Sequence, residues 1–458
     1  MKHEYTGPVH GIRLLRAIYG VLALACLLLT TEIKAQELKH IDSLSLQQAV
    51  QFAVQNNKHI GAAHIKNAIS SANTAVAKNN QLPDVDFHTS YERFNTLTEY
   101  RGGLNNPVRI PTIHDMYDIT LTAKVPLYAG NRIKNEIVKS RQEEQLAALN
   151  TEKTENDVHL EVVEQYLGIY KLMRLDAVMA EQEKEDERRL KEVQALKRNG
   201  AVTKNEILRA ELQLSDLQLT RITNHKNITI ACHDLQTTLG LPEEDTLVLD
   251  TMQLLHNELP EKDYAAYAAA AMNKDEIRQS LKEEAIAQTE RKIVKGAYYP
   301  TIGLFGQYAY KYPDYMMFPP TPYLYSLGMV GVDVSFSISN LYKNKKKMAV
   351  ADKKIALQQM ETSIRRDEVN DRVFKAYTQY TEMLERVPVT EKAIQQAEEN
   401  YHIVKTKYLN QLALITDMID ADNSLLQARF NNVAEHINVQ LQYYRLQYAS
   451  GNINTFHN

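Results

Sequence analysis

The stretch ITLTAKVPL, residues 119–127, alternates apolar and polar side chains as far as Val125. Similar alternation runs through residues 85–92 and 330–336, and a more mixed version occupies residues 302–310. Because successive side chains of a strand point to opposite faces, this pattern predicts strands with one apolar face. We expect four strands, at about residues 84–94, 117–128, 301–311 and 326–338. Each has the length of about ten residues that a tilted membrane strand needs.

The loops between the paired strands are rich in aromatic residues, namely Tyr100, Tyr312, Tyr315, Phe318, Tyr323 and Tyr325. Such loops are typical of the aromatic girdle of a membrane barrel. Alternation alone slightly favours a soluble hairpin packed on a helix, but strand length, tyrosine content and the signal peptide described below together favour the barrel. Four strands cannot close a barrel, since the smallest membrane barrels have about eight. The chain should therefore share its barrel with copies of itself.

The N-terminus has the pattern of a secretory signal peptide, residues 1–35. Basic residues precede an apolar run over 17–29, and cleavage is expected after Ala35. The run is shorter than the roughly 20 residues of a membrane helix. In an alternative interpretation Cys26 carries a lipid, but the apolar run continues past it through Leu29. We expect a mature chain without a lipid that begins at Gln36.

Long helices should make up most of the remainder. Residues 131–199 contain no Pro and only Gly168 as an interior glycine, which predicts a helix of roughly 100 Å. Apolar stripes that predict helix–helix seams run along it and near the C-terminus: Val158, Val162, Tyr166, Ile169 and Met173, then Ile437, Leu441, Tyr444 and Tyr448. Pro388 should kink or restart the corresponding second helix near Val387.

The chain is one unit duplicated. Leu82-Pro83 corresponds to Tyr299-Pro300, residues 125–131 to 334–340, and residues 199–210 to 410–421, at offsets of 217, 209 and 211. We expect a first repeat at 36–240, a connector at 241–262, a second repeat at 263–448 and a C-terminal tail at 449–458.

Composition excludes several classes of protein. The formal charge of −4 offers no basic nucleic-acid surface, and two Cys exclude a disulfide scaffold. No phosphate loop, zinc motif or nucleophile elbow is present in the sequence. We expect neither an enzyme nor a cofactor.

The sequence resembles the outer membrane efflux protein family, the TolC-type channels, over about residues 43–448. The similar segments are Ser45-Leu46-Gln47-Gln48-Ala49, Leu82-Pro83, residues 126–132 (PLYAGNR) and residues 239–242 (LGLP). The resemblance implies a mainly α protein with a membrane β-barrel portion: a trimer with a 12-stranded barrel in the outer membrane, continued by a periplasmic α-barrel of 12 helices. It also places an equatorial collar at the connector.

The family's entrance segment resembles residues 408–421. In this segment the resemblance implies that Tyr408 helps to hold the tip shut and that Asp417 and Asp420 form a ring around the pore. An Arg of the family also helps to hold the tip shut, and Ala413 occupies its position here. A solvated helix face explains the two Asp equally well. Lys343, Lys345, Lys346 and Lys347 follow the last strand, and we interpret them as a solvated helix start rather than a contact with lipid headgroups.

The resemblance implies a passive exit duct of a tripartite efflux or type I secretion system. Its expected partners are a periplasmic adaptor (membrane fusion) protein, an inner-membrane pump of the resistance-nodulation-division or ABC type, and outer membrane lipid. The alternative is an elongated helical periplasmic tether that does not conduct. The sequence does not distinguish export of drugs, metals or proteins.

Overall fold

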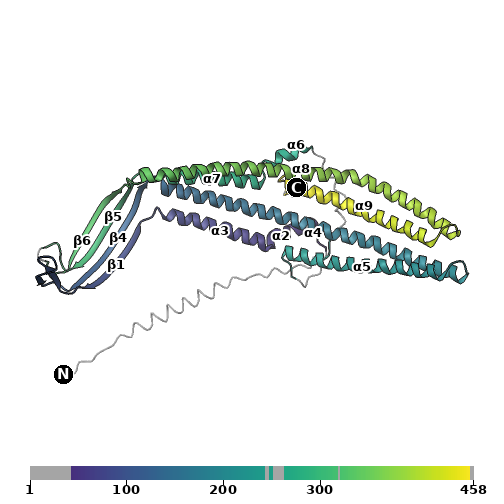
Figure 1. Cartoon of the computed structure of the whole chain (residues 1–458), viewed down its shortest axis with the longest axis horizontal. Coiled ribbons are helices and arrows are strands. Elements are labelled where there is room, and N and C mark those ends of the chain that lie inside the picture. The colour runs from purple at the N-terminus through teal and green to yellow at the C-terminus, as the bar shows by residue number, and fades with distance from the viewer. Residues whose placement is uncertain (1–42, 243–246, 251–262, 318–319, 454–458) are drawn as a thin grey trace, which may run out of the picture.

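The computed structural model describes residues 43–242, 247–250, 263–317 and 320–453, and the predicted signal peptide with Cys26 lies outside these ranges. The described residues form one elongated body, with strands at one end and long helices over the rest of its length (Figure 1).

Four strands form an antiparallel sheet in the order β1-β4-β5-β6. They are β1 (Asp84–Arg93), β4 (Asp115–Ala129), β5 (Thr301–Tyr312) and β6 (Tyr325–Ser335). The first three agree with the predicted stretches to within two residues, and β6 ends three residues before the predicted 338. A short hairpin, β2 (Leu97–Tyr100) with β3 (Pro107–Ile110), extends the loop between β1 and β4 and was not predicted.

The register of the sheet gathers apolar side chains on one face. Phe87 pairs with Leu121, which pairs on its other side with Tyr308, and these three side chains are all exposed. Val330 and Val332 extend the same face onto β6, with 80% and 60% of their surface exposed. An exposed apolar face of this size is typical of a surface that contacts lipid or another protein. Within the described residues, β1 and β6 each have one edge without a partner strand.

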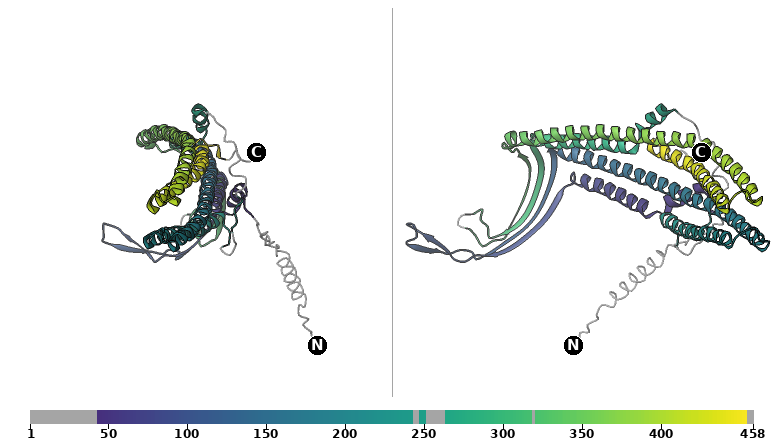
Figure 2. Two further views of the ribbon diagram at one scale, coloured as in Figure 1. Left: turned by 90° about the vertical axis from the view of Figure 1, so that its right-hand side faces the viewer. Right: turned by 45° about the vertical axis from the view of Figure 1, so that its right-hand side comes forward.

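Two helices run almost the whole length of the helical part (Figures 1 and 2). They are α4 (Arg132–Arg198, 67 residues) and α8 (Asn340–Leu409, 70 residues). The remaining helices are α2 (Leu46–Asn56), α3 (Lys58–Asn79), α5 (Lys204–Leu239), α6 (Tyr264–Ala271), α7 (Asp275–Gly296) and α9 (Ile415–Ala449). The predicted helix over 131–199 is therefore confirmed. Among the described helices, none combines the length and apolarity needed to cross a membrane.

The helices form a layer whose two edges differ. Helices α7 and α9 lie between α4 and α8, whereas α3 and α5 pack on the other side of α4. One edge of the layer is thus α3 with α5, and the opposite edge is α8. The element order α3-β1-β4-α4-α5 recurs as α7-β5-β6-α8-α9, in agreement with a duplicated unit.

A buried cluster at mid-height joins the first repeat to the connector. Val162 and Tyr166 of α4 are fully buried there, and the Tyr166 hydroxyl lies 2.8 Å from the carbonyl oxygen of Leu44 and 2.6 Å from that of Asp250. Leu249 pairs with Leu44 in a parallel bridge, so the described part of the connector, residues 247–250, packs against the helices. Of the predicted seam on α4, four residues are buried, but Met173 is 39% exposed.

Of the two expected alternatives near Val387, a kink or a restart, the restart is wrong, because α8 is one helix from Asn340 to Leu409 with Pro388 inside it. Proline removes one N–H donor, but packing on α9 continues on both sides of this position: Arg386 pairs with Glu435, and Thr390 bonds Asn432. These tertiary contacts therefore stabilise the helix at the position where Pro388 removes a backbone hydrogen bond.

Candidate functional site

The site predicted from sequence lies at the end of the molecule farthest from the strands (Figure 1). Here two helical hairpins turn, at residues 199–203 between α4 and α5 and at residues 410–414 between α8 and α9. We call this end the tip. Val193, Tyr408, Ile415 and Met418 form a small buried core there, which fastens the two hairpins to each other.

Tyr408 anchors this core. Its ring is buried, and its hydroxyl donates a hydrogen bond to Glu206 Oε2 of α5 at 3.2 Å. Burial, together with the negative charge of Glu206, raises the pKa of Tyr408 to about 12. The hydroxyl therefore remains a donor throughout the physiological pH range, and it links the end of α8 to the start of α5.

The other three predicted residues differ in their surroundings. Ala413, at the position of the family's Arg, packs against the tip core. Asp417 and Asp420 are exposed on the first two turns of α9, and Asp417 Oδ2 accepts a hydrogen bond from the backbone N–H of Leu414 at 3.0 Å. Asp417 therefore caps the N-terminus of α9, independently of any role at the pore. The structure brings Tyr408 and Ala413 together in the core and leaves both carboxylates in solvent.

Sequence reasoning missed two groups of tip residues. Glu206 is related to Asp417 by the repeat offset of 211, so the duplication carried a signal for it that was not used. The second group is a buried ion cluster in which Arg189 of α4 pairs with Asp186 on the same helix and with Asp422 of α9. Arg189 and Asp422 are 233 positions apart and in different repeats, so no local pattern connects them.

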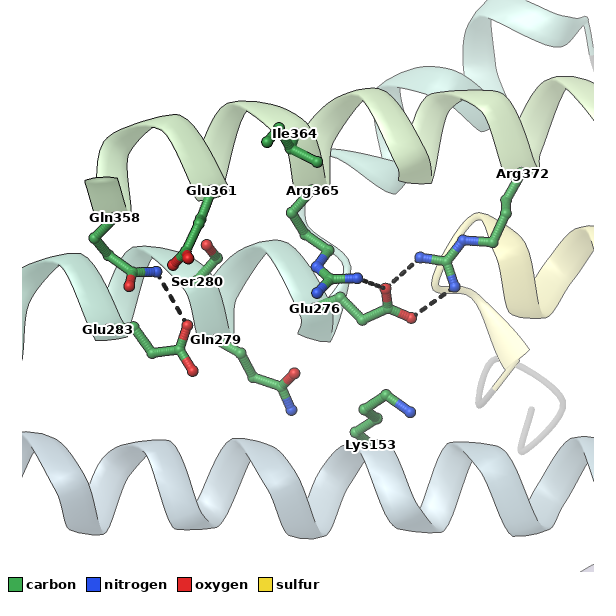
Figure 3. Close-up of a pocket in the computed structure, with 10 residues that line it drawn as sticks. All are labelled: Lys153, Glu276, Gln279, Ser280, Glu283, Gln358, Glu361, Ile364, Arg365 and Arg372. Carbon is green, nitrogen blue, oxygen red and sulfur yellow. Dashed lines mark hydrogen bonds and ion pairs between the residues drawn. The ribbon is translucent and has the colours of Figure 1, made fainter. Parts of the chain in front are cut away.

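A charged cleft of about 620 Å³ lies midway along the helices, between α4, α7 and α8 (Figure 3). Its centre is Glu276, which accepts two hydrogen bonds from Arg372 and lies 3.9 Å from Arg365. Burial opposes ionisation of Glu276, but Arg372 and the ammonium of Lys274 outweigh it and lower the pKa of the carboxyl. Basic side chains gather around Glu276, whereas Glu283 and Glu361 line the other end of the cleft (Figure 3). We interpret the cleft as a structural link between helices.

The charged run after the last strand is solvated. Lys343, Lys345, Lys346 and Lys347 are exposed in the first turns of α8, which fits the predicted solvated helix start. Across the part of the chain that the structure describes, no group of three or more His, Cys, Asp or Glu side chains is arranged to hold a metal ion.

Comparisons with known proteins agree with this architecture. The sequence profile of the outer membrane efflux proteins matches residues 49–241. Among curated protein sequences none matches the chain.

Among solved structures, CusC, whose structures concern transmembrane channel formation, matches with a TM-score of 0.76 and 13% identity over 89% of this chain and 92% of its own. The outer membrane protein VceC of Vibrio cholerae matches with a TM-score of 0.73 and 15% identity over 89% and 96%. The MtrE outer membrane channel of Neisseria gonorrhoeae matches with a TM-score of 0.70 and 16% identity over 89% of each chain. At these identities the structures share the fold. The profile match covers residues 49–241, and the shared fold extends the likeness to outer membrane channels over most of the chain.

Proposed function

We propose that three copies of the chain form a closed duct, which carries substrates from a pump and a periplasmic adaptor to the cell exterior. The likeness to this family supports a location in the outer membrane, with the helices extending into the periplasm. The family consists of channels rather than enzymes. The observation that carries the proposal is the pair of complementary open edges of the single chain.

The strand edges require partners in a membrane. β1 and β6 are the outer strands of the sheet, and an unpaired strand edge in lipid leaves backbone donors and acceptors without hydrogen bonds. Pairing β1 of one copy with β6 of the next satisfies both edges at once. Three copies then supply twelve strands, the number that the family resemblance implies, whereas two copies would supply eight.

The helix edges support the same assembly. Apolar side chains are exposed along α3 and α5 on one edge and along α8 on the other. They are Ile65, Ile69, Val76, Leu208, Leu212, Leu219, Ile222 and Ile230 on the first edge, and Val350, Leu357, Met360, Ile364, Val389 and Ile403 on the second. Stripes of this length on a helical layer are typical of an interface between copies.

The tip is the proposed entrance. In a trimer, Asp417 and Asp420 of each copy surround the axis, while Tyr408 holds the hairpins in their resting position. Leu409, Leu412 and Leu414 are exposed at the α8–α9 turn, with 51%, 77% and 68% of their surface accessible, and form an apolar contact for the adaptor.

Cell fractionation and pull-down test the proposal. The protein should be extracted from the outer membrane only by detergent, and it should co-purify with an adaptor and an inner-membrane pump. Leu412→Ser combined with Leu414→Ser should reduce recovery of the adaptor without changing the mass of the channel itself. Release of the wild-type chain with soluble periplasm would support a helical tether instead.

A further inference from the structure

The buried ion cluster near the tip carries one negative charge more than it has cations. It lies between α4 and α9, immediately above the tip core. The side chains of Asp186, Arg189 and Asp422 are 1%, 3% and 3% exposed, and Gln182 is buried beside them.

The contacts leave one carboxylate oxygen without a donor. Gln182 Nε2 donates to Asp186 Oδ1 at 2.9 Å and to Asp422 Oδ2 at 2.6 Å. Arg189 lies 3.1 Å from Asp186 Oδ1 and also donates to Asp422 Oδ2. Among the described residues, none donates a hydrogen bond to Asp186 Oδ2, although this atom is buried.

Among the described residues, Arg189 is the cation that forms ion pairs with Asp186 and Asp422. From α8, the Tyr401 hydroxyl lies 3.5 Å from Arg189, and the Lys405 ammonium lies 5.4 Å from the centre of the Tyr401 ring. On the side that faces α5, Arg189 interacts electrostatically with Tyr408. The Tyr408 hydroxyl itself donates a hydrogen bond to the acidic Glu206. Two carboxylates therefore share one guanidinium in a site closed to water. Burying an unpaired charge is costly, and a carboxyl in this position relieves the cost by binding a proton.

We propose that Asp186, which shares the Arg189 guanidinium with Asp422, binds one proton, and that the protonated cluster clamps the α4–α5 hairpin to the α8–α9 hairpin. Asp186 Oδ2, the oxygen without a donor, is the place for the proton. The clamp depends on contacts within one chain. Its effect on a channel entrance rests on the proposed function.

The direction of the pH effect follows from the shift at Asp186. Burial raises the pKa of this carboxyl to about 6, with Arg189 opposing the shift and Asp422 adding to it. A carboxyl whose pKa is raised in the packed state stabilises that state fully below its unperturbed pKa of 3.8 and loses this contribution as pH rises through about 6. The tip should therefore be held more tightly at pH 5 than at pH 7.5. Between pH 5 and pH 7.5 the raised pKa changes the equilibrium between closed and open hairpins by roughly 10-fold.

Hydrogen exchange of the intact detergent-solubilised protein tests the clamp without measuring conduction. Asp186→Asn mimics the protonated carboxyl, so the segments 176–206 and 408–426 should exchange several-fold more slowly than wild type at pD 7.5. At pD 5 the two proteins should exchange alike. Comparison at one pD cancels the intrinsic pH dependence of exchange. Glu187→Gln, at the exposed position next to Asp186 on α4, should match wild type at both values.

Two further measurements keep the test decisive. Asp422→Asn leaves one carboxylate for one guanidinium and should also abolish the pH dependence. Infrared titration of the wild type should show a protonated carboxyl band growing between pH 7.5 and 5 that both variants lack. Equal exchange of wild type and Asp186→Asn at pD 7.5, or absence of the band, would overturn the clamp. A protein that passes these tests but conducts no ions would contradict the duct and leave the proton site intact.

Discussion

At the scale of single residues, Asp417 illustrates how one side chain can have a structural role and a functional one. Its carboxylate caps α9 through the Leu414 N–H, and the same carboxylate belongs to the proposed entrance ring. Truncation to Ala removes cap and charge together, and the loss of a cap alone costs about 1 kcal/mol. Substitution by Asn removes the charge and keeps an acceptor for the N–H.

We predict that Asp417→Asn combined with Asp420→Asn relieves block by multivalent cations and weakens cation selectivity. Six carboxylates around a narrow aperture attract cations, and their neutral isosteres do not. Single-channel recording in planar bilayers, with the blocker added on the tip side, measures both effects. An unchanged block and an unchanged reversal potential would identify the two residues as ordinary solvated positions on α9.

Tyr408→Phe isolates the hydroxyl from the ring. The ring still fills the tip core, but the bond to Glu206 is lost, which should destabilise the contact between the hairpins by about 1–2 kcal/mol. Resting conductance should therefore rise, and Glu206→Gln should produce a smaller rise. Because the pKa of Tyr408 is raised to about 12, the difference from wild type should stay constant between pH 6 and 9. A difference that varies over this range would contradict the assignment.

At the scale of elements, the joint between strands and helices depends on two glycines in contact. Gly130 follows β4 with a φ of 64°, and a Cβ at this position would lie 2.2 Å from the carbonyl oxygen of Gly296 at the end of α7. Backbones can approach this closely only where side chains are absent. The two repeats thus meet at the base of the sheet through their main chains.

Gly130→Ala should consequently destabilise the protein by about 3 kcal/mol, through the clash and the left-handed backbone together. Gly168→Ala is the matched control, since nothing lies within 4 Å of a Cβ there. In the middle of α4 that change should stabilise by about 0.5–1 kcal/mol. Thermal unfolding of the two variants compares them, and similar midpoints would show that the contact at Gly130 is unimportant.

At the scale of the whole molecule, local periodicity explains what the sequence could predict. The alternation through residues 119–127 and the absence of Pro from 131–199 act on neighbouring residues, so strands and long helices were predictable to within a few positions. Contacts between residues of different repeats were not predictable from such local patterns. The helix was expected to kink or restart near Val387, but it does not restart, because packing on α9 stabilises it on both sides of Pro388. The charges of Asp186 and Arg189 gave no sign that they would be buried. Tyr408 was singled out by resemblance and Glu206 could have been found from the repeat, but the hydrogen bond between them required the three-dimensional fold.

The proposed duct depends on whether the open edges of one copy pair with those of the next copy. Native mass spectrometry of the detergent-solubilised protein counts the copies directly, and a Cys232→Ser background permits disulfide trapping between cysteines placed on β1 and β6. We predict three times the mass of the processed chain, with trapped β1–β6 pairs that join different copies. A complex of two chains, or a stable single chain with no trapped pairs, would contradict the closed trimeric duct.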